Sequence, residues 1–350
     1  MIVKLNNISI SAISTAIPKQ QFEIKDLCPS YSTEEIKRLV SVTGIESVRI
    51  APKDLCTSDL CLEAAKLLLL ELGVSPSDID GIVFVSQTPD YIMPATSLIL
   101  QAKLNLRKDI VAFDINYGCS AYVYGLLQAS LLVSSSSCKK VLVCVGDVIS
   151  KYVNPRDKSL IVIFGDAGSA TLVEKGNHSI AFNIMSEGSG AQYLVIKAGS
   201  NRYPKNKDTC IERIDEDGNW HTDENLYMDG IQLMNFCLSN VPATINDLLR
   251  FVGWAKEEIG FFGLHQANKF LVNSIRKRIG VKEECVPITM QNTGNTGPAS
   301  LPLLLSIEHE RLNRENRLEK SILSGFGSGL SCGAVACNLA ESKIFSPLEI

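Results

Sequence analysis

Apolar and polar positions follow two patterns that alternate along the whole chain. Short, nearly continuous apolar runs, such as GIVFVSQ at 81–87, have the length and the β-branched content of buried strands. Longer runs, such as DLCLEAAKLLLLEL at 59–72, place apolar residues at helical spacing, with Ser58 or Asp59 as the cap and Gly73 after the last turn. Strand-like and helix-like runs that take turns in this way predict an α/β fold with largely parallel sheets.

The same order of elements is expected twice. In the first half we expect strands at 8–17, 81–87, 110–116, 141–149 and 169–174, and helices at 59–72, 94–105 and 119–134. In the second half we expect strands at 180–185, 260–266, 285–290, 321–326 and 334–340, and helices at 229–250, 267–279 and 298–312. No repeat is visible at the level of residues, so the duplication is one of element order. It divides the chain into halves at 1–176 and 177–350.

Composition and charge narrow the class of protein. A chain of 350 residues with 45 % apolar and 21 % charged residues suits two domains, or one domain of two similar halves, with a large core. The net charge of −4 lacks the basic surplus that nucleic-acid binding requires. We see no apolar run long enough to span a membrane and no apolar block typical of a secretory signal at the N-terminus. We therefore expect a cytoplasmic protein that binds neither nucleic acid nor membrane.

The cysteines are numerous but show no pairing pattern. There are 11 cysteines beside 4 histidines, with no Cys-x-x-Cys and no Cys/His cluster at zinc spacing. Scattered thiols in apolar segments are typical of a reducing compartment. Neither a disulfide framework nor a metal site is expected, and most of these cysteines are interpreted as small apolar filling.

Three residues stand where expected strands end. Cys119 follows the third strand of the first half and begins a helix, His265 ends the second strand of the second half, and Asn295 follows its third strand. Ligands of α/β sheets collect outside the carboxyl ends of strands, so related halves would bring these residues to one cavity. A helix N-terminus favours a thiolate, histidine can exchange its proton, and an asparagine amide is a neutral donor.

Each of these features also has a simpler interpretation. A single cysteine is more often an inert buried residue, a histidine can be a satisfied structural one, and QNTGNTGPAS at 291–300 is in any case a turn and a helix cap. In FGDAGSA at 164–170 we favour a tight turn in which Asp166 bonds backbone groups, whereas GFGSGLSCG at 325–333 is either a turn or a loop that approaches a ligand.

The helix expected after His265 is basic. Lys269 and Arg276 are seven residues apart and share a face, and Lys277 and Arg278 follow directly. The simpler interpretation is a solvated face. The functional interpretation is a landing site for an acidic partner.

Several motifs in one order carry a resemblance to a known family. They are TGIESVRI at 43–50, Cys119 in its strand–helix junction, FGDAGSA, HQAN at 265–268, GNT at 294–296 and the closing GFGSG. Over nearly its whole length the chain resembles β-ketoacyl-acyl-carrier-protein synthase III, a condensing enzyme of the thiolase-like superfamily. The resemblance implies a five-layer α-β-α-β-α sandwich of two pseudo-duplicated halves, usually a homodimer. It implies no metal and no resident cofactor, with coenzyme A and acyl-carrier thioesters as substrates.

The resemblance also implies a reaction. Cys119 would take the acyl group of a primer thioester, carried by coenzyme A or by acyl-carrier protein. Malonyl-acyl-carrier protein would then lose CO₂ and attack the acyl-cysteine, giving 3-oxoacyl-acyl-carrier protein. His265 and Asn295 would stabilise the enolate that decarboxylation forms.

Further roles follow from the same resemblance. The Cys119 N–H and the amides of a site loop would form the oxyanion hole. That loop comprises Phe326, Gly327, Ser328 and Gly329. The Phe326 side chain would exclude water from the site. Met93 would reach into the acyl pocket of the partner subunit. The basic residues of the helix after His265 add a candidate docking site for the carrier protein, made of Lys269, Arg276 and Lys277.

The chain departs from the family pattern at substrate-recognition positions. Arg38 and Val42 stand where the family often has a tryptophan and an arginine for coenzyme A, and Phe270 replaces an arginine. Ser328 interrupts a run of three glycines, and Met93 takes the place of a phenylalanine. These departures indicate intact chemistry with altered coenzyme A recognition and acyl-chain choice, and leave open a specialised pathway.

Other functions are weaker alternatives. The runner-up is an acyltransferase that moves the acyl group from Cys119 to an alcohol or amine without decarboxylation. A catalytically idle carrier-binding subunit is disfavoured because all three site residues are retained. A papain-like thiol hydrolase is disfavoured by the order and context of its candidate residues.

Overall fold

The computed structural model describes residues 1–216 and 218–350. Its longer strands are β1 (Ile2–Ile17), β4 (Gly81–Val85), β5 (Val111–Ile115), β6 (Lys140–Asp147), β7 (Ala167–Ser186), β12 (Phe261–Leu264), β13 (Ser321–Gly327) and β14 (Ser331–Cys337). Its α-helices are α1 (Ile24–Leu27), α2 (Thr33–Thr43), α3 (Thr57–Leu72), α4 (Thr96–Lys103), α5 (Ala121–Ser134), α6 (Gly230–Val252), α7 (Lys269–Ile279) and α8 (Ser300–Arg314). Short strands are β2 (Gln21–Glu23), β3 (Ser47–Arg49), β8 (Leu194–Ile196), β9 (Arg213–Ile214), β10 (Trp220–His221), β11 (Leu226–Met228), β15 (Lys343–Ile344) and β16 (Leu348–Glu349).

The strands of both halves form one continuous ten-stranded sheet, whose two parts, described below as two sheets, share the long strand β7. The first sheet has the order β5-β4-β6-β7-β1, in which β4, β5 and β6 are parallel and β7 is antiparallel to both neighbours. The second has the order β12-β13-β14-β7, in which β14 is antiparallel to both neighbours. In the first half, the expected first, second, fourth and fifth strands are β1, β4, β6 and β7; in the second half they are the C-terminal part of β7, β12, β13 and β14. In both halves the spatial order is second, fourth, fifth, first. The sheets are therefore mixed, and the expectation of largely parallel sheets was wrong for the last strand of each half.

The strand expected at 285–290 is absent. Short 3₁₀ turns at Glu283–Cys285 and Met290–Asn292 flank irregular chain there. Pro287 has no N–H to give to a strand ladder. The side chain of Gln266 bonds the segment instead, accepting from the Thr289 N–H at 2.9 Å and donating to the Pro287 carbonyl at 3.4 Å. The second half therefore lacks the edge strand that the first half has in β5.

The two strands expected at 169–174 and 180–185 are one continuous strand. β7 runs on through the polar residues between them, and β1 pairs with it antiparallel from end to end, with irregularities in register between Asn6 and Ile8 and between Ile10 and Ala12. Pairing with so long a partner satisfies the backbone groups of the polar stretch, which a turn would otherwise have to satisfy. The expected boundary between residues 176 and 177 therefore lies inside β7. The division into two halves remains a proposal, in which both halves share this strand.

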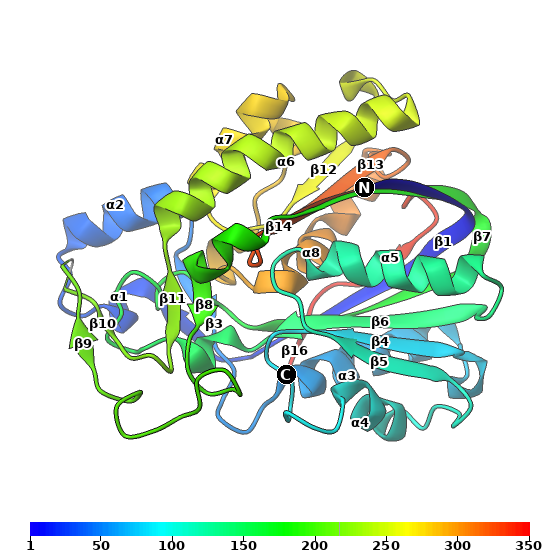
Figure 1. The fold of residues 1–350 in the computed structure, drawn as a ribbon. Helices are drawn as coiled ribbons and strands as arrows, with labels where there is room; N and C mark the ends of the chain where they lie inside the picture. Colours follow the sequence, from blue (N-terminus) through cyan, green and yellow to red (C-terminus); the bar gives the residue numbers. More distant parts are fainter. Residues whose placement is uncertain (217) are drawn as a thin grey trace.

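Helices and sheets alternate in five layers (Figure 1). α6 and α7 lie over the sheet of β12, β13 and β14, and α3 and α4 lie under the sheet of β4, β5 and β6. α5 and α8 lie between the two sheets, and both contact strands of each half. Cys119 follows the carboxyl end of β5, and His265 follows that of β12. These two strand ends therefore come together near the middle layer.

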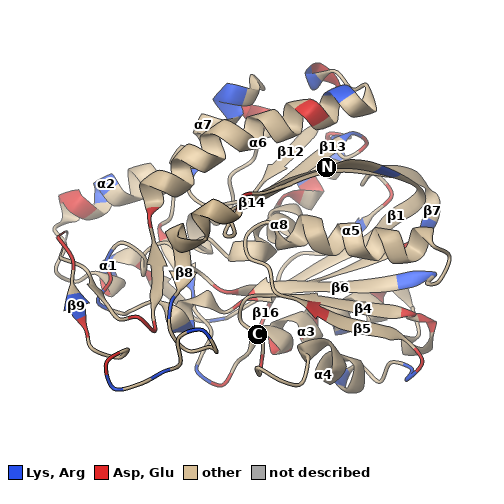
Figure 2. Ribbon diagram, in the orientation of Figure 1, with Lys and Arg blue, Asp and Glu red and all other residues tan. Residues whose placement is uncertain are grey.

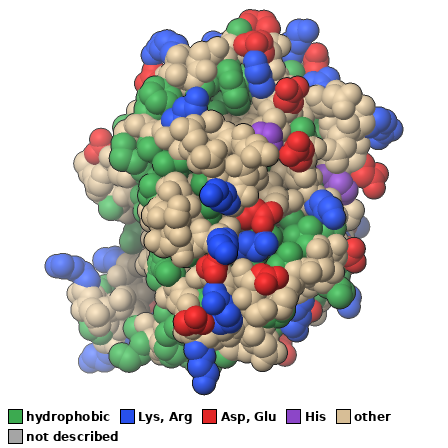
Figure 3. All heavy atoms as spheres, turned by 90° about the vertical axis from the view of Figure 1, so that its right-hand side faces the viewer, with side chains coloured by type: hydrophobic (Ala, Val, Ile, Leu, Met, Phe, Trp, Pro, Cys, Tyr) green, Lys and Arg blue, Asp and Glu red, His purple; other side chains and the backbone are tan. Residues whose placement is uncertain are grey.

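The amino-acid pattern of α5 explains its central position. Its sequence, AYVYGLLQASLLVS, has no charged residue and buries side chains on several faces, as the successive buried residues Ala121, Tyr122 and Val123 show. A helix that is apolar around most of its circumference is stable only when it is covered on several sides. Charged residues instead mark the outer helices, the loops and the strand ends (Figure 2). On the face drawn in Figure 3 both signs of charge are interspersed.

Helix α2 was not expected, although its sequence carries start and stop signals. Ser32 and Glu35 form a capping box, in which the Ser32 Oγ accepts from the Glu35 N–H and the Glu35 carboxylate accepts from the Ser32 N–H. Gly44 ends the helix with φ of 73°, in the left-handed region that favours glycine. Among the described residues, no helix combines the length and apolar character needed to cross a membrane.

Candidate active site

Cys119, His265 and Asn295 line one cavity of about 140 Å³, together with Phe326 and Gly327. The cysteine comes from the junction of β5 and α5. The histidine follows β12, and the asparagine lies in the turn that precedes α8. Cys119 and Asn295, 176 positions apart along the chain, line the same cavity because the two halves face each other across the middle layer.

Cys119 is held two residues before α5, between a loop and a hairpin. Gly118 precedes it, and a Cβ there would lie 2.9 Å from the Cβ of Ser328, so this close approach favours glycine. The next residue, Ser120, places its Oγ 2.7 Å from that of Ser331 in β14. These contacts fix the position of Sγ from both sides.

The thiol of Cys119 is harder to ionise than an ordinary cysteine. Burial, together with the Asp147 carboxylate, raises its pKa to about 11, although the backbone N–H groups of Ser328 and of Cys119 itself oppose the rise. The helix N-terminus was expected to favour the thiolate. With its pKa raised to about 11, Cys119 is instead a thiol at neutral pH.

The loop after β13 packs directly against this sulfur. Gly327 has φ of 145°, and a Cβ there would lie 3.0 Å from the Cβ and 3.1 Å from the Sγ of Cys119. The Ser331 Oγ donates to the Ser328 carbonyl at 2.7 Å and so fixes the loop. The Ser328 N–H points at Sγ. Two backbone N–H groups, those of Cys119 and Ser328, therefore meet at the sulfur.

His265 is buried and neutral. Its Nδ1 lies 2.6 Å from the Oγ of Ser300, and among the described residues no hydrogen bond engages its Nε2, the ring nitrogen left toward the cavity. Phe326 packs edge-on against the ring at a centroid distance of 5.3 Å. Burial lowers the pKa of His265 to about 3, so the imidazole carries no charge at neutral pH.

Asn295 is fixed by backbone pairing with the segment Ile163–Gly165. Its N–H donates to the Ile163 carbonyl at 2.8 Å, and its carbonyl accepts from the Gly165 N–H at 3.0 Å. Its side-chain Oδ1 accepts from the Gly297 N–H at 3.0 Å. The amide therefore keeps its Nδ2 donors for the cavity that it lines.

The FGDAGSA segment supports this arrangement as a turn. Asp166 is fully buried and accepts hydrogen bonds from the Ala51 N–H at 2.8 Å and from the N–H and Oγ of Ser150 at 3.1 and 2.5 Å. The interpretation that Asp166 bonds backbone groups is confirmed. Its role is to hold the turn that pairs with Asn295.

A second cavity, of about 520 Å³, meets the first at Cys119. Phe164 and Leu194 also line both cavities. Its further lining residues include Gln87, Asp147, Ile149, Lys205, Glu224 and Ser328. Cys119 thus stands at a junction with open space on two sides.

The remaining candidate residues lie outside the catalytic cluster. Met93 is 78 % exposed and lines neither cavity, whereas its neighbour Ile92 lines the second. Phe270 is half exposed at the wall of the first cavity. Arg38 and Val42 are exposed on α2, which contacts α7.

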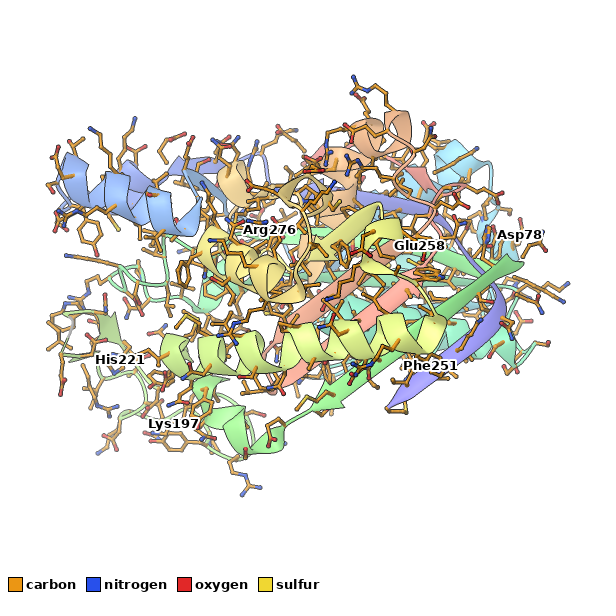
Figure 4. The ribbon with its side chains drawn as sticks, turned by 90° about the horizontal axis from the view of Figure 1, so that it is seen from above. Asp78, Lys197, His221, Phe251, Glu258 and Arg276 are labelled. Atoms are coloured by element: carbon orange, nitrogen blue, oxygen red, sulfur yellow. The ribbon has the colours of Figure 1, made fainter. Side chains whose placement is uncertain are left out.

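The basic residues of α7 are not equivalent. Lys269 and Lys277 are exposed. Arg276, labelled on α7 in Figure 4, has a side chain only 14 % exposed, pairs with Glu283 at 3.5 Å and donates to the Val281 carbonyl at 3.3 Å. Arg276 therefore stabilises the end of its own helix. Within the described part of the chain, we find no group of three or more potential ligands that could hold a metal, and all 11 cysteines are free.

Two residues of this region were missed by sequence reasoning. Ser300 lies inside the quoted segment 291–300, but nothing in the local pattern indicates its contact with His265. Asp147 ends β6 at the carboxyl edge of the first sheet. The rule that found Cys119 at the end of β5 could therefore have found Asp147 as well.

The five layers, the strand order and the cysteine between the halves define a thiolase-like condensing enzyme. Family models support this class: the 3-oxoacyl-[acyl-carrier-protein] synthase III model matches residues 113–199, which contain Cys119. The model of the C-terminal part of that family matches residues 249–339, which contain His265 and Asn295.

Similar proteins extend over nearly the whole chain. A β-ketoacyl-[acyl-carrier-protein] synthase III of Natranaerobius thermophilus is 32 % identical over 94 % of this chain and 98 % of its own length. The crystal structure of a 3-oxoacyl-(acyl-carrier protein) synthase of Burkholderia xenovorans superposes with a TM-score of 0.92 and 32 % identity, covering 100 % of this chain and 99 % of that one. Another solved 3-oxoacyl-(acyl-carrier-protein) synthase III gives 0.88 at 36 % identity, covering 95 % and 99 %.

The chain belongs to the 3-oxoacyl-acyl-carrier-protein synthase III family. It is therefore a condensing enzyme of the acyltransferase class, and its sandwich of two related halves is the thiolase-like fold expected from the motifs.

Proposed function

We propose that the protein condenses an acyl thioester primer with malonyl-acyl-carrier protein, with loss of CO₂, through an acyl-Cys119 intermediate. The product is 3-oxoacyl-acyl-carrier protein. One observation carries the proposal: Cys119 stands where two cavities meet, and one of them contains both His265 and Asn295. The acyl chain can then lie in the second cavity while the extender occupies the first.

In the first step the Cys119 sulfur attacks the primer thioester. Because burial raises the pKa of this thiol, attack and proton loss occur together, and Nε2 of His265, the ring nitrogen that Ser300 leaves free, accepts the proton. The N–H groups of Cys119 and Ser328 stabilise the tetrahedral oxyanion. The C–S bond to the carrier breaks, and the His265 proton passes to the departing thiolate.

In the second step the malonyl thioester loses CO₂. The electron pair of the broken C–C bond forms an enolate, whose oxygen accepts hydrogen bonds from Nδ2 of Asn295 and Nε2 of His265. The enolate carbon attacks the acyl-cysteine carbonyl, and the Cys119 sulfur leaves as a thiolate that takes one proton from solvent. Neutral donors suit this step because they remain hydrogen-bonded without ionising.

Ser300 allows His265 to serve in both steps. When Nε2 accepts a proton, Nδ1–H donates to the serine oxygen; when Nε2–H donates, the serine hydroxyl donates to Nδ1. A hydroxyl at 2.6 Å can take either role by rotation. Ser300 is a positioning residue in this proposal.

The carrier protein docks near the entrance of the first cavity. Lys269 lies between Asn268 and Phe270, which both line that cavity, and Lys277 extends the exposed basic face of α7. Carrier proteins present acidic surfaces in this proposal, so these cations attract them at long range. We further propose a cytoplasmic homodimer in which Met93 approaches the acyl pocket of the partner subunit.

Intact-mass measurement tests the first half of the proposal. A panel of acyl-CoA and acyl-carrier thioesters should add one acyl group to the protein, and peptide mapping should place it on Cys119. Absence of any adduct would contradict both condensation and simple acyl transfer. An adduct that an alcohol or amine removes, with no CO₂ released from malonyl-acyl-carrier protein, would favour the acyltransferase instead.

A further inference from the structure

The second cavity contains a buried carboxylate that the proposed reaction does not use. Asp147 is only 3 % exposed and lines the cavity wall beside Cys119. Its Oδ1 is fully occupied: it accepts from the Ser86 Oγ at 2.7 Å, from the Gln87 N–H at 2.8 Å, and from the Thr88 N–H and Oγ1 at 3.1 and 3.0 Å. These bonds fix the carboxyl group and its direction.

The other oxygen, Oδ2, has no hydrogen-bond partner among the described residues. Gly297 is the neighbour on that side, and a Cβ built there would lie 3.6 Å from Oδ2. Gly297 also lines the second cavity, so the absence of a side chain leaves the oxygen open to that space. A carboxylate oxygen that faces a cavity and has no donor from the protein can accept a hydrogen bond from a donor on a ligand.

The other charged residues of this cavity are already paired. Glu224 accepts from Lys205 at 2.8 Å and from the Thr209 Oγ1 at 2.7 Å, and Lys205 is largely exposed. Of the described charged residues in the wall, Asp147 alone therefore offers an uncommitted acceptor. The rest of the wall includes Ile149, Leu226 and other apolar side chains that suit a short carbon chain.

We propose, on the basis of the function proposed above, that the second cavity selects a primer acyl chain bearing a hydroxyl group that donates to Oδ2 of Asp147. Cys119 would carry the acyl carbonyl, and the chain would extend from it along the apolar wall to the carboxylate. An acyl chain with only an acceptor, such as a ketone, meets the lone pairs of Oδ2 and is rejected. A plain alkyl chain leaves the oxygen unsatisfied.

The test measures the rate of Cys119 acylation, by intact mass, with six coenzyme A thioesters. They are butyryl, 2-, 3- and 4-hydroxybutyryl, 4-aminobutyryl and 3-oxobutyryl thioesters. Because a hydrogen bond to a charged group contributes about 1.5–3 kcal/mol, one hydroxybutyryl thioester should react about tenfold or more faster than butyryl. The 3-oxobutyryl thioester should react more slowly than butyryl.

Asp147→Asn is the decisive variant because it nearly preserves shape. Its amide oxygen can keep the four hydrogen bonds of Oδ1, while an NH₂ group replaces Oδ2. The variant should lose the hydroxyl preference and accept 3-oxobutyryl at least as well as butyryl. Glu224→Gln is the matched control: it lines the same cavity but is already paired, so the preference should persist.

The outcomes separate this inference from the proposed function. Acylation of Cys119 by any thioester supports the function, whereas the ratio between thioesters tests the cavity. Equal rates for alkyl and hydroxyalkyl chains in the parent protein would overturn the hydroxyl proposal and leave Asp147 a structural residue. A preference for the 4-aminobutyryl chain would overturn it in favour of a cationic primer. If Asp147→Asn fails to fold, the panel on the parent protein still decides.

Discussion

The two cavities that meet at Cys119 differ in the chemistry of their walls. The first contains His265 and Asn295, which are both uncharged and both present a nitrogen to the open space. The second contains Asp147, a carboxylate with an uncommitted oxygen. An enolate gains from neutral donors and loses beside a carboxylate, so decarboxylation belongs in the first cavity. The comparison separates the residues that perform the reaction from those that choose the acyl chain.

The largest expected effect is the loss of acylation when the Cys119 sulfur, which lies where the two cavities meet, is removed. Cys119→Ala should lower acylation by on the order of 10³-fold or more, because no other group can form the thioester. Intact mass after incubation with an acyl thioester measures it. Cys237→Ala is the matched control, since Cys237 is a buried cysteine of the first cavity and should be dispensable. An adduct that persists in Cys119→Ala would place the nucleophile elsewhere.

The next largest effect separates the acylation step from the decarboxylation step, which we assign to the first cavity. Asn295→Asp keeps the oxygen that accepts from Gly297 but replaces the amide donor by a carboxylate that opposes the enolate. Acylation of Cys119 should change little, while CO₂ release from malonyl-acyl-carrier protein should fall about 10²–10³-fold. Asn295→Ala should show the same division. Loss of acylation in both variants would contradict the assignment of Asn295 to the decarboxylation step.

The pH dependence of Cys119 alkylation tests the dry environment at the junction. Burial raises the pKa of this thiol to about 11, so the thiolate fraction should grow about tenfold per pH unit from pH 7 to 10. The rate of modification by iodoacetamide, followed by peptide mass, should therefore keep rising above pH 9. An ordinary thiol is half ionised near pH 8.5, so its rate would level off about one pH unit higher, at pH ~9.5. A plateau at or below that pH would show that the helix N-terminus prevails over burial.

The smallest expected effect concerns the entrance of the first cavity. Lys269→Glu and Lys277→Glu together should raise KM for the carrier protein severalfold at low salt, with less effect at high salt because exposed charges are screened. Lys108→Glu, an exposed lysine beside the opposite, amino end of β5, is the control. An unchanged KM would place the docking surface elsewhere, and acylation by a coenzyme A thioester should be unaffected in both the double variant and the control.

Much of the fold followed from the sequence because buried strands and helices leave strong local patterns. The central α5 and the strands β4 and β13 lie within a few residues of their expected ranges. Expectations failed where tertiary contacts override local pattern. The segment at 285–290 is bonded by the Gln266 side chain rather than by a neighbouring strand, and β7 continues through a polar stretch because β1 pairs along it.

The site could be predicted only in part for a related reason. The rule for carboxyl ends of strands correctly selects Cys119 and His265, which follow β5 and β12, whereas Asn295 was selected through an expected strand at 285–290 that is absent. Ser300 acts through a contact between residues 35 positions apart, which no local pattern reveals. Arg276 looked like a docking residue by helical spacing, yet its guanidinium bonds the end of its own helix.

Single-turnover condensation tests the central claim most directly. Protein acylated at Cys119 is freed of excess primer and mixed with malonyl-acyl-carrier protein, and the acyl adduct, CO₂ and the carrier-bound product are measured together by mass. The proposed mechanism predicts that one CO₂ and one 3-oxoacyl-acyl-carrier protein form for each acyl group lost from Cys119. Loss of the acyl group without CO₂, or CO₂ without transfer of that acyl group, would contradict it.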